Sequence, residues 1–136
     1  MEKHHYYEFE GFQNVYLEDS FVLEIRESQN EFLLILEVVL TEKHPLYRLP
    51  EPHEMYCYKM AMIDFPDIKT IEWDAKNSSK YLDANGENDL GNIDSFFFKG
   101  DHYFLMGDWG EVKIKSSKPV IYFQPLGEIE SNHPSK

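Results

Sequence analysis

The amino-acid sequence predicts an all-β protein, built as an antiparallel β-sandwich or a partly open barrel of about eight short strands. Short apolar or alternating runs recur along the chain and are separated by turn residues. No segment has the apolar spacing of a convincing amphipathic helix. Aromatic residues make up 15% of the 136 residues, and aromatic side chains favour strands.

The first expected strands form a hairpin. Phe21, Leu23 and Ile25 alternate with charged residues, as in a strand with one face open to water. The segment 31–40, EFLLILEVVL, is almost entirely apolar, and the residues SQN precede it as a turn. We therefore expect 31–40 to be a central strand that is covered on both faces.

The segment 41–54, TEKHPLYRLPEPHE, is expected to be a long loop. Its prolines, Pro45, Pro50 and Pro52, are incompatible with a helix interior or a central strand. Long loops in compact domains often carry function. Further strands are expected at 55–65, 68–73, 93–99, 102–107, 111–115 and 119–123. The short turns between the last of these strands predict antiparallel pairing.

The length fits a single domain over residues 1–136, with loose ends expected at 1–10 and 127–136. The formal net charge is -12, from 25 acidic and 13 basic residues. Such a charge repels phosphate backbones and anionic lipids, so we expect no nucleic-acid partner and no membrane partner. It attracts a basic protein partner, although the same charge also serves solubility alone.

Cys57 is the only cysteine, so an internal disulfide is impossible and a reducing compartment is favoured. The first residues, MEKHHYYEFEGF, lack the basic start and the apolar stretch of a signal peptide. No apolar run approaches the length of about 18 residues that a membrane span requires. We therefore expect a cytoplasmic protein.

The segment 83–96, DANGENDLGNIDSF, combines carboxylates with turn residues. Its oxygen-bearing side chains alternate in a way that is similar to an EF-hand loop. However, Asn88 stands where that loop needs glycine, and Asp94 stands where it needs glutamate. A calcium site of another geometry stays an alternative. The dipeptides at 85–86 and 91–92 favour a two-turn connection whose carboxylates offer a docking surface to a basic partner.

The segment 106–111, MGDWGE, predicts a hairpin turn with Trp109 at or beside its tip, where Gly107 or Gly110 supplies the unusual backbone conformation. Trp109 either lies exposed beside Asp108, as a binding hot spot or a sugar-stacking platform, or folds back over the core. The candidate partner-binding residues are Asp83, Glu87, Asp89, Asp94, Asp108 and Trp109. The alternative site, for a small ligand or a carbohydrate, combines Trp109 with Tyr47 and His53 of the proline-containing loop.

The six histidines do not show the spacing with a nearby acid that marks a metal site. The chain also lacks a nucleophile elbow, a phosphate-binding loop and a dinucleotide-binding motif. We therefore expect neither a metal nor a cofactor, and favour a protein that is not an enzyme. A small hydrolase is the third alternative, since acids such as Asp64 and Asp67 could lie close together.

The markers LEDSFVLEI, HPLY, CY, DLGNID and GDWGEVKI, which span the chain from Leu17 to about Val120, resemble a family of small uncharacterised bacterial all-β proteins. The size, acidity and β-rich pattern are also similar to immunity proteins that neutralise bacterial toxins. Neither likeness transfers an activity or a functional residue to this chain. The leading hypothesis is a non-enzymatic, immunity-like binding protein that engages a basic protein partner.

Overall fold

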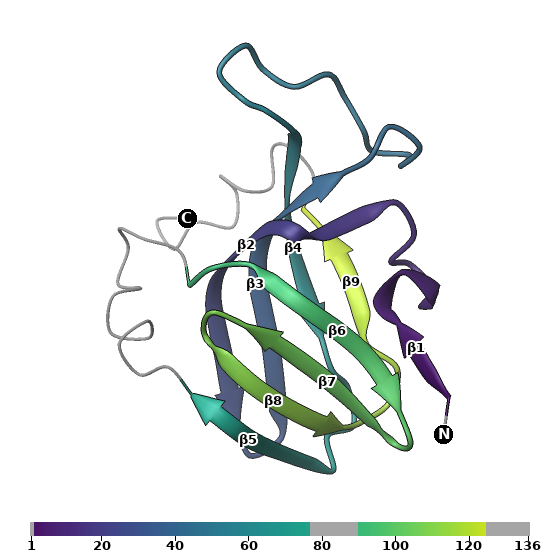
Figure 1. The fold of residues 1–136 in the computed structure, drawn as a ribbon, viewed down its shortest axis with the longest axis vertical. Coiled ribbons are helices and arrows are strands. Elements are labelled where there is room, and N and C mark those ends of the chain that lie inside the picture. The colour runs from purple at the N-terminus through teal and green to yellow at the C-terminus, as the bar shows by residue number, and fades with distance from the viewer. Residues whose placement is uncertain (1, 77–89, 125–136) are drawn as a thin grey trace.

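The computed structural model describes residues 2–76 and 90–124, which form nine β-strands and one short 3₁₀ helix without any α-helix (Figure 1). In chain order the elements are β1 (Lys3–His5), η1 (Tyr6–Glu8), β2 (Val15–Ser28), β3 (Glu31–Leu40), β4 (Cys57–Asp64), β5 (Thr70–Lys76), β6 (Ile93–Lys99), β7 (His102–Gly107), β8 (Gly110–Lys115) and β9 (Val120–Phe123). Each predicted strand has a counterpart; the ends of 31–40, 93–99 and 102–107 are as predicted, and those of the other strands are shifted. None of these elements is a helix long and apolar enough to cross a membrane.

The strands form two antiparallel sheets, one in the order β1-β6-β7-β8-β5 and the other in the order β2-β3-β4-β9. The two sheets pack face to face around one hydrophobic core and do not close into a barrel (Figure 1). The predicted all-β sandwich is therefore confirmed, including the antiparallel pairing of the last strands.

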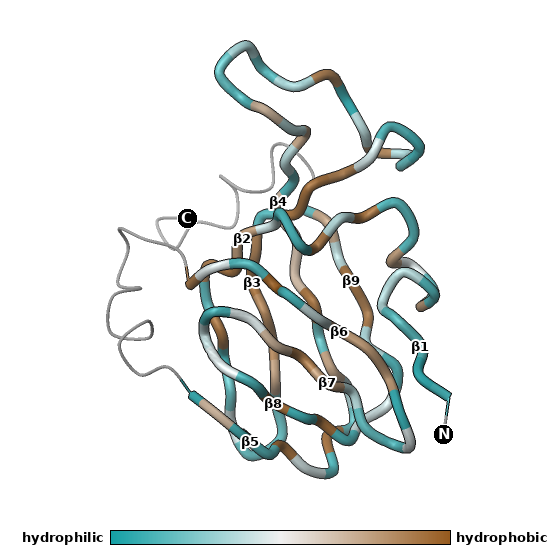
Figure 2. Tube along the Cα trace, in the orientation of Figure 1, coloured by the Kyte–Doolittle hydropathy of each residue, from teal (hydrophilic) through white to brown (hydrophobic). Residues whose placement is uncertain are grey.

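Strand β3 is the centre of the four-stranded sheet, and it pairs with β2 through the expected tight hairpin. Its residues Phe32, Leu34 and Leu36 are fully buried between the sheets, and Figure 2 shows the strand as hydrophobic over most of its length. Leu33 and Ile35, which point to the other side, stay half-buried. The expectation of cover on both faces is thus wrong at Leu33 and Ile35, because a two-layer sandwich leaves each sheet one outer face, whereas Val39 on the same outer side is buried.

Residues at the N-terminus, which were expected to be loose, are tied to both sheets. Strand β1 pairs with β6, and Tyr6 is buried. The Tyr6 hydroxyl donates to Glu18 Oε1 at 2.6 Å and accepts the backbone N–H of Leu17 at 3.1 Å. Phe9 and Phe12 follow and pack against Phe96, so aromatic burial fixes the segment that was expected to be loose. The expected loose end at 127–136 lies outside the described residues.

The two sides of the sandwich differ. On one side, Leu90 and Gly91 form backbone hydrogen bonds with Val22 of β2, at 2.7 and 2.8 Å, and so connect the two sheets. On the other side, the edge of β9 faces the segment β1–η1 without a described strand pairing between them. The predicted loop 41–54 contains no helix or strand, and it extends to residue 56 because β4 begins only at Cys57. This loop, 41–56, projects beyond one end of the sheets (Figure 1).

Candidate partner-binding surfaces

The acidic segment is described only in part, since Asp83, Glu87 and Asp89 lie outside the described residues. Asp94 and Asp108 are both exposed, and the structure brings them to the same end of the molecule. Asp94 accepts a hydrogen bond from Asn92 at 3.0 Å. Asp108 packs against Gly91, and two features require glycine there. Its φ of 106° is a conformation that other residues rarely adopt, as expected. A Cβ on residue 91 would also lie only 2.7 Å from the Asp108 Cβ.

Trp109 belongs to the core and not to a binding site. Its side chain is 0% exposed, its ring meets that of Trp73 edge to face at 6.0 Å, and its Nε1–H donates to the carbonyl oxygen of Asn92 at 3.1 Å. A buried indole that has a partner for its N–H cannot offer a platform to a sugar or a protein. Trp109 is therefore removed from both candidate sites, and the alternative that it folds back over the core is what the structure shows.

The other two residues of the alternative ligand site also separate. Tyr47 lines a pocket of about 290 Å³ where strands β2, β3 and β4 end beneath the loop 41–56. His53 is exposed on the loop and does not line that pocket. Tyr47, His53 and Trp109 thus do not form one site.

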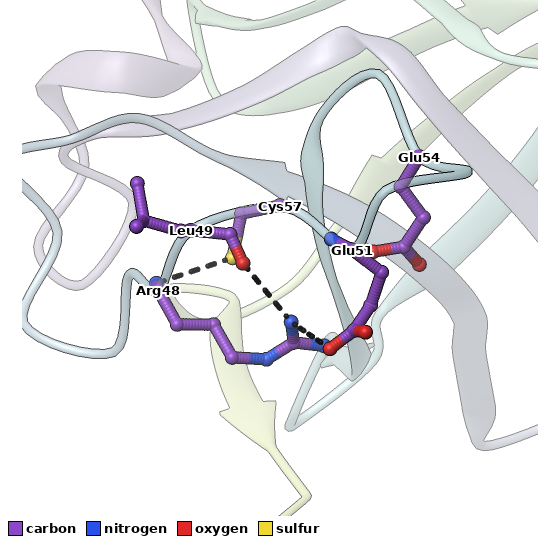
Figure 3. Close-up of polar contacts among 5 residues, drawn as sticks. All are labelled: Arg48, Leu49, Glu51, Glu54 and Cys57. Carbon is purple, nitrogen blue, oxygen red and sulfur yellow. Dashed lines mark hydrogen bonds and ion pairs between the residues drawn. The ribbon is translucent and has the colours of Figure 1, made fainter.

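The loop 41–56 is held in place by its own polar contacts (Figure 3). The backbone N–H of Arg48 donates to the buried Cys57 Sγ at 3.5 Å, and the Arg48 guanidinium reaches the carbonyl oxygen of Leu49 and the Glu51 carboxylate. At the start of the loop, His44 is buried, accepts the backbone N–H of Leu46 and packs its ring 5.0 Å from Phe123. Burial lowers the pKa of His44. The loop is therefore an ordered element that can present a defined surface.

The outer face of the four-stranded sheet carries a group of apolar and aromatic side chains, which we call the aromatic face. Strand register places Val39 opposite both Tyr16 and Tyr58, and Met62 opposite both Ile35 and Tyr122. The aromatic face consists of Tyr16, Phe21, Ile35, Val39, Tyr58, Met60, Met62 and Tyr122. Tyr122 is 50% exposed, and no described segment covers the face as a layer.

Carboxylates gather around the Tyr58 end of the aromatic face. The pKa of Tyr58 is raised by burial first, and then by the negative potential of neighbours that include Asp19, Glu37 and Glu54. Arg26, on the same face, is already paired with Glu24 at 2.8 Å. The negative charges continue from Asp19 towards Asp94 and Asp108. The Asn92 side chain donates both to the carbonyl oxygen of Glu18, the neighbour of Asp19, and to the Asp94 carboxylate, and Asp108 packs against Gly91 beside it.

The outer face of the five-stranded sheet carries more lysines, although it also holds Phe97 and Phe104, which stack at 5.0 Å, and Glu72, which pairs with Lys113 at 3.8 Å. Lys99 of β6 lies opposite both Lys3 and His102, and Lys113 of β8 lies opposite Phe104. Lys115 adds a further positive charge that is paired with Asp101 at 3.2 Å. The two outer faces therefore differ in charge, and a basic partner is attracted to the four-stranded side.

A cleft of about 940 Å³ lies on the open side of the sandwich, between β9 and the segment β1–η1. Phe9, Phe98 and Tyr103 line it, and burial raises the pKa of Tyr103.

Strand β9 presents a free backbone edge to this cleft. The N–H of Gln124, which follows β9, donates to the carbonyl oxygen of Met60 in β4. Because hydrogen-bonded positions alternate in an antiparallel pair, the backbone polar groups of Ile121 and Phe123 point away from β4, at the free edge.

Neither a metal centre nor a carboxylate pair for catalysis emerges from the described residues. No group of three His, Cys, Asp or Glu side chains lies close enough to hold a metal within 2–76 and 90–124. Asp67 accepts a hydrogen bond from Ser117 at 2.8 Å, whereas Asp64 lies on the outer face of β4. Comparisons with known protein families, curated proteins and solved structures found no match for this chain, so the inference of function rests on these surfaces.

The aromatic face was not predicted from the amino-acid sequence, although one signal for it exists. In the segment MYCYKMAMID, Tyr58, Met60 and Met62 alternate with the inward-facing Cys57 and Ala61. A strand that is apolar at both alternating sets of positions in a two-layer fold must expose one of them.

Proposed function

We propose that the protein is a non-enzymatic binding protein that engages a basic protein partner through the aromatic face. The observation that carries this proposal is the sheet surface of Tyr, Phe and Met side chains, which no other layer within residues 2–76 and 90–124 covers, with carboxylates near Tyr58. Interfaces are enriched in aromatic residues and Met and depleted in Lys, and uncovered apolar patches of this kind mark interaction sites.

Charge supports a basic partner over an acidic or neutral one. The formal net charge of -12 speeds the approach of a cationic protein, and the carboxylates near Tyr58 orient it. Asp94 and Asp108 extend the negative edge, so the acidic residues act as a steering surface and the aromatic side chains as anchors. Neutralising a basic toxin, as immunity proteins do, is one function of this type. The free, buried Cys57 fits a reducing compartment, so we place this binding in the cytoplasm.

Paired variants test the proposal. The aromatic-face variant Tyr58→Lys/Met62→Lys adds two positive charges to the proposed interface. The control variant Phe104→Lys/Met106→Lys makes the same change at outward positions of the five-stranded sheet. Melting curves must first show that both variants are folded. Proteins captured from cells of the source organism by wild type and variants are then identified and purified.

We expect a basic protein that binds wild type and the control variant but loses binding to the aromatic-face variant. Its association rate should fall as salt rises, because exposed charges are screened over about 8 Å at physiological ionic strength. A partner that tolerates the aromatic-face variant contradicts the proposal, as does the capture of acidic partners alone or of no basic protein that separates the two variants.

A second candidate function is the binding of a small ligand or a carbohydrate in the cleft beside β9. Its volume of about 940 Å³ suits a small molecule, its aromatic lining offers stacking surfaces, and the edge groups of Ile121 and Phe123 offer hydrogen bonds. An NMR screen of saccharides and small aromatic compounds tests this function. Saturable shifts of Phe98 and Tyr103 resonances support it, and shifts confined to other surfaces count against it.

A further inference from the structure

The pocket beneath the loop 41–56 has the size of a subsite. Its volume of about 290 Å³ is just below the range of about 300–1,000 Å³ that is typical of small-molecule sites. Its walls include the tyrosines Tyr16, Tyr47 and Tyr56, together with Met55 and Glu42. The pocket therefore suits one long side chain better than a whole ligand.

The chemistry of the walls selects a cation. Tyrosine rings attract a cation that sits over their faces, and Tyr16 and Tyr56 are 43% and 38% exposed, so both rings are accessible. None of the ten described residues that line the pocket is Lys, Arg or His, and Glu42 supplies the only charged side chain of the lining. The ring of Tyr56 lies 6.1 Å from that of Tyr58, where the carboxylates gather. A positive group is thus the complement of the pocket.

The pocket is formed before a partner arrives. Thr41 N–H donates to the carbonyl oxygen of Asn14 at 3.0 Å, Tyr47 N–H donates to that of His44 at 3.0 Å, and Arg48 N–H donates to Cys57 Sγ. The loop prolines further restrict the backbone. A site that is ordered in advance loses less entropy when it binds.

We propose that this pocket receives an arginine side chain of the basic partner, an inference that rests on the function proposed above. Arginine fits better than lysine because its planar guanidinium stacks on aromatic rings and donates two parallel hydrogen bonds to a carboxylate such as Glu42. A guanidinium is also more weakly hydrated than an ammonium, so a tyrosine-lined pocket takes it up more readily.

The probe for this test is N-acetyl-arginine methylamide, and its control is the corresponding citrulline compound, which keeps the shape of the side chain without the charge. Protein labelled at its methionine methyl groups reports the position of binding, because Met55 lines the pocket and Met106 lies on the other sheet. We expect a saturable shift of the Met55 signal with the arginine probe, at least tenfold weaker binding of the citrulline compound, and no shift of Met106.

Variants identify the contacts. Tyr56→Leu and Glu42→Gln should each weaken arginine binding by about twofold to fivefold, as expected for one exposed cation–π contact or one exposed ion pair. Tyr7→Leu removes an exposed tyrosine outside the pocket and should leave the affinity unchanged. Equal binding of both probes overturns the inference, and so does an unmoved Met55 signal or unchanged affinity in both pocket variants.

These results separate the two proposals. If the captured basic partner depends on Tyr58 and Met62 but the pocket takes no arginine, only the inference about the pocket fails. If the arginine probe binds in the pocket but no basic partner requires the aromatic face, the proposed function fails while the arginine site stands.

Discussion

Trp109→Ala removes the largest fully buried side chain among the described residues. Truncation of a buried Phe or Trp to Ala costs about 3–5 kcal/mol. The substitution also takes the Nε1–H donor from the carbonyl oxygen of Asn92, which adds ~1 kcal/mol. We therefore expect the free energy of unfolding to fall by about 4 kcal/mol or more, a large part of the roughly 5–15 kcal/mol of a typical domain.

Urea denaturation followed by circular dichroism measures this loss. Trp109→Phe keeps most of the buried ring and loses the donor, so it should cost about 1–2 kcal/mol and remains measurable if Trp109→Ala does not fold. The matched control is Tyr122→Ala, which truncates a half-exposed aromatic and should cost less than about 1 kcal/mol. If Trp109→Ala costs no more than Tyr122→Ala, the placement of Trp109 in the core is wrong.

Tyr6→Phe leaves the buried N–H of Leu17 without its acceptor and should lower the free energy of unfolding by about 1–3 kcal/mol in urea denaturation; no change contradicts the anchoring of the N-terminus. Burial lowers the pKa of His44 in the folded state, so the unfolded chain binds a proton more readily at this residue than the folded protein does. The contribution of neutral His44 to the free energy of unfolding should be complete above about pH 6.5 and should be lost as the pH falls through the lowered folded pKa. Denaturation at several pH values checks this, and His44→Gln should flatten the dependence. Gly91→Ala forces a side chain into a backbone with φ of 106° and against Asp108, and should cost more than about 1 kcal/mol; an unchanged melting temperature refutes that geometry.

The strands were predictable because their signals are local. The apolar run 31–40 and the turn residues between 93 and 115 each determine structure over a few residues. The alternation in 21–25 marks a strand but is wrong about its faces, because a register shift between Val22 and Glu24 puts Phe21 on the outer face and Ile25 opposite the buried Leu34. Strand β1 was missed because KHH has no apolar periodicity, and the strand forms only by pairing with β6. The burial of Tyr6 in η1 likewise depends on Leu17 and Glu18, which belong to β2.

The candidate site was less predictable because it depends on which strands are neighbours. The acidic residues drew attention through their number, and Trp109 through its position at a turn, but neither reveals which side of a sheet a residue faces. Tyr16 and Tyr58 meet on one face only because β2 and β4 both pair with β3. A strand order that arises from long-range pairing cannot be inferred from local patterns.

The central claim is that a basic protein binds the aromatic face, and the methionine methyl groups test it most directly. Met60 and Met62 lie on that face, Met55 lies on the adjoining loop, and Met106 lies on the outer face of the other sheet. Addition of the captured basic partner to wild-type protein with labelled methionine methyl groups should shift or broaden the signals of Met55, Met60 and Met62 and leave Met106 unchanged. A perturbation of Met106 that leaves Met60 and Met62 in place would contradict the account.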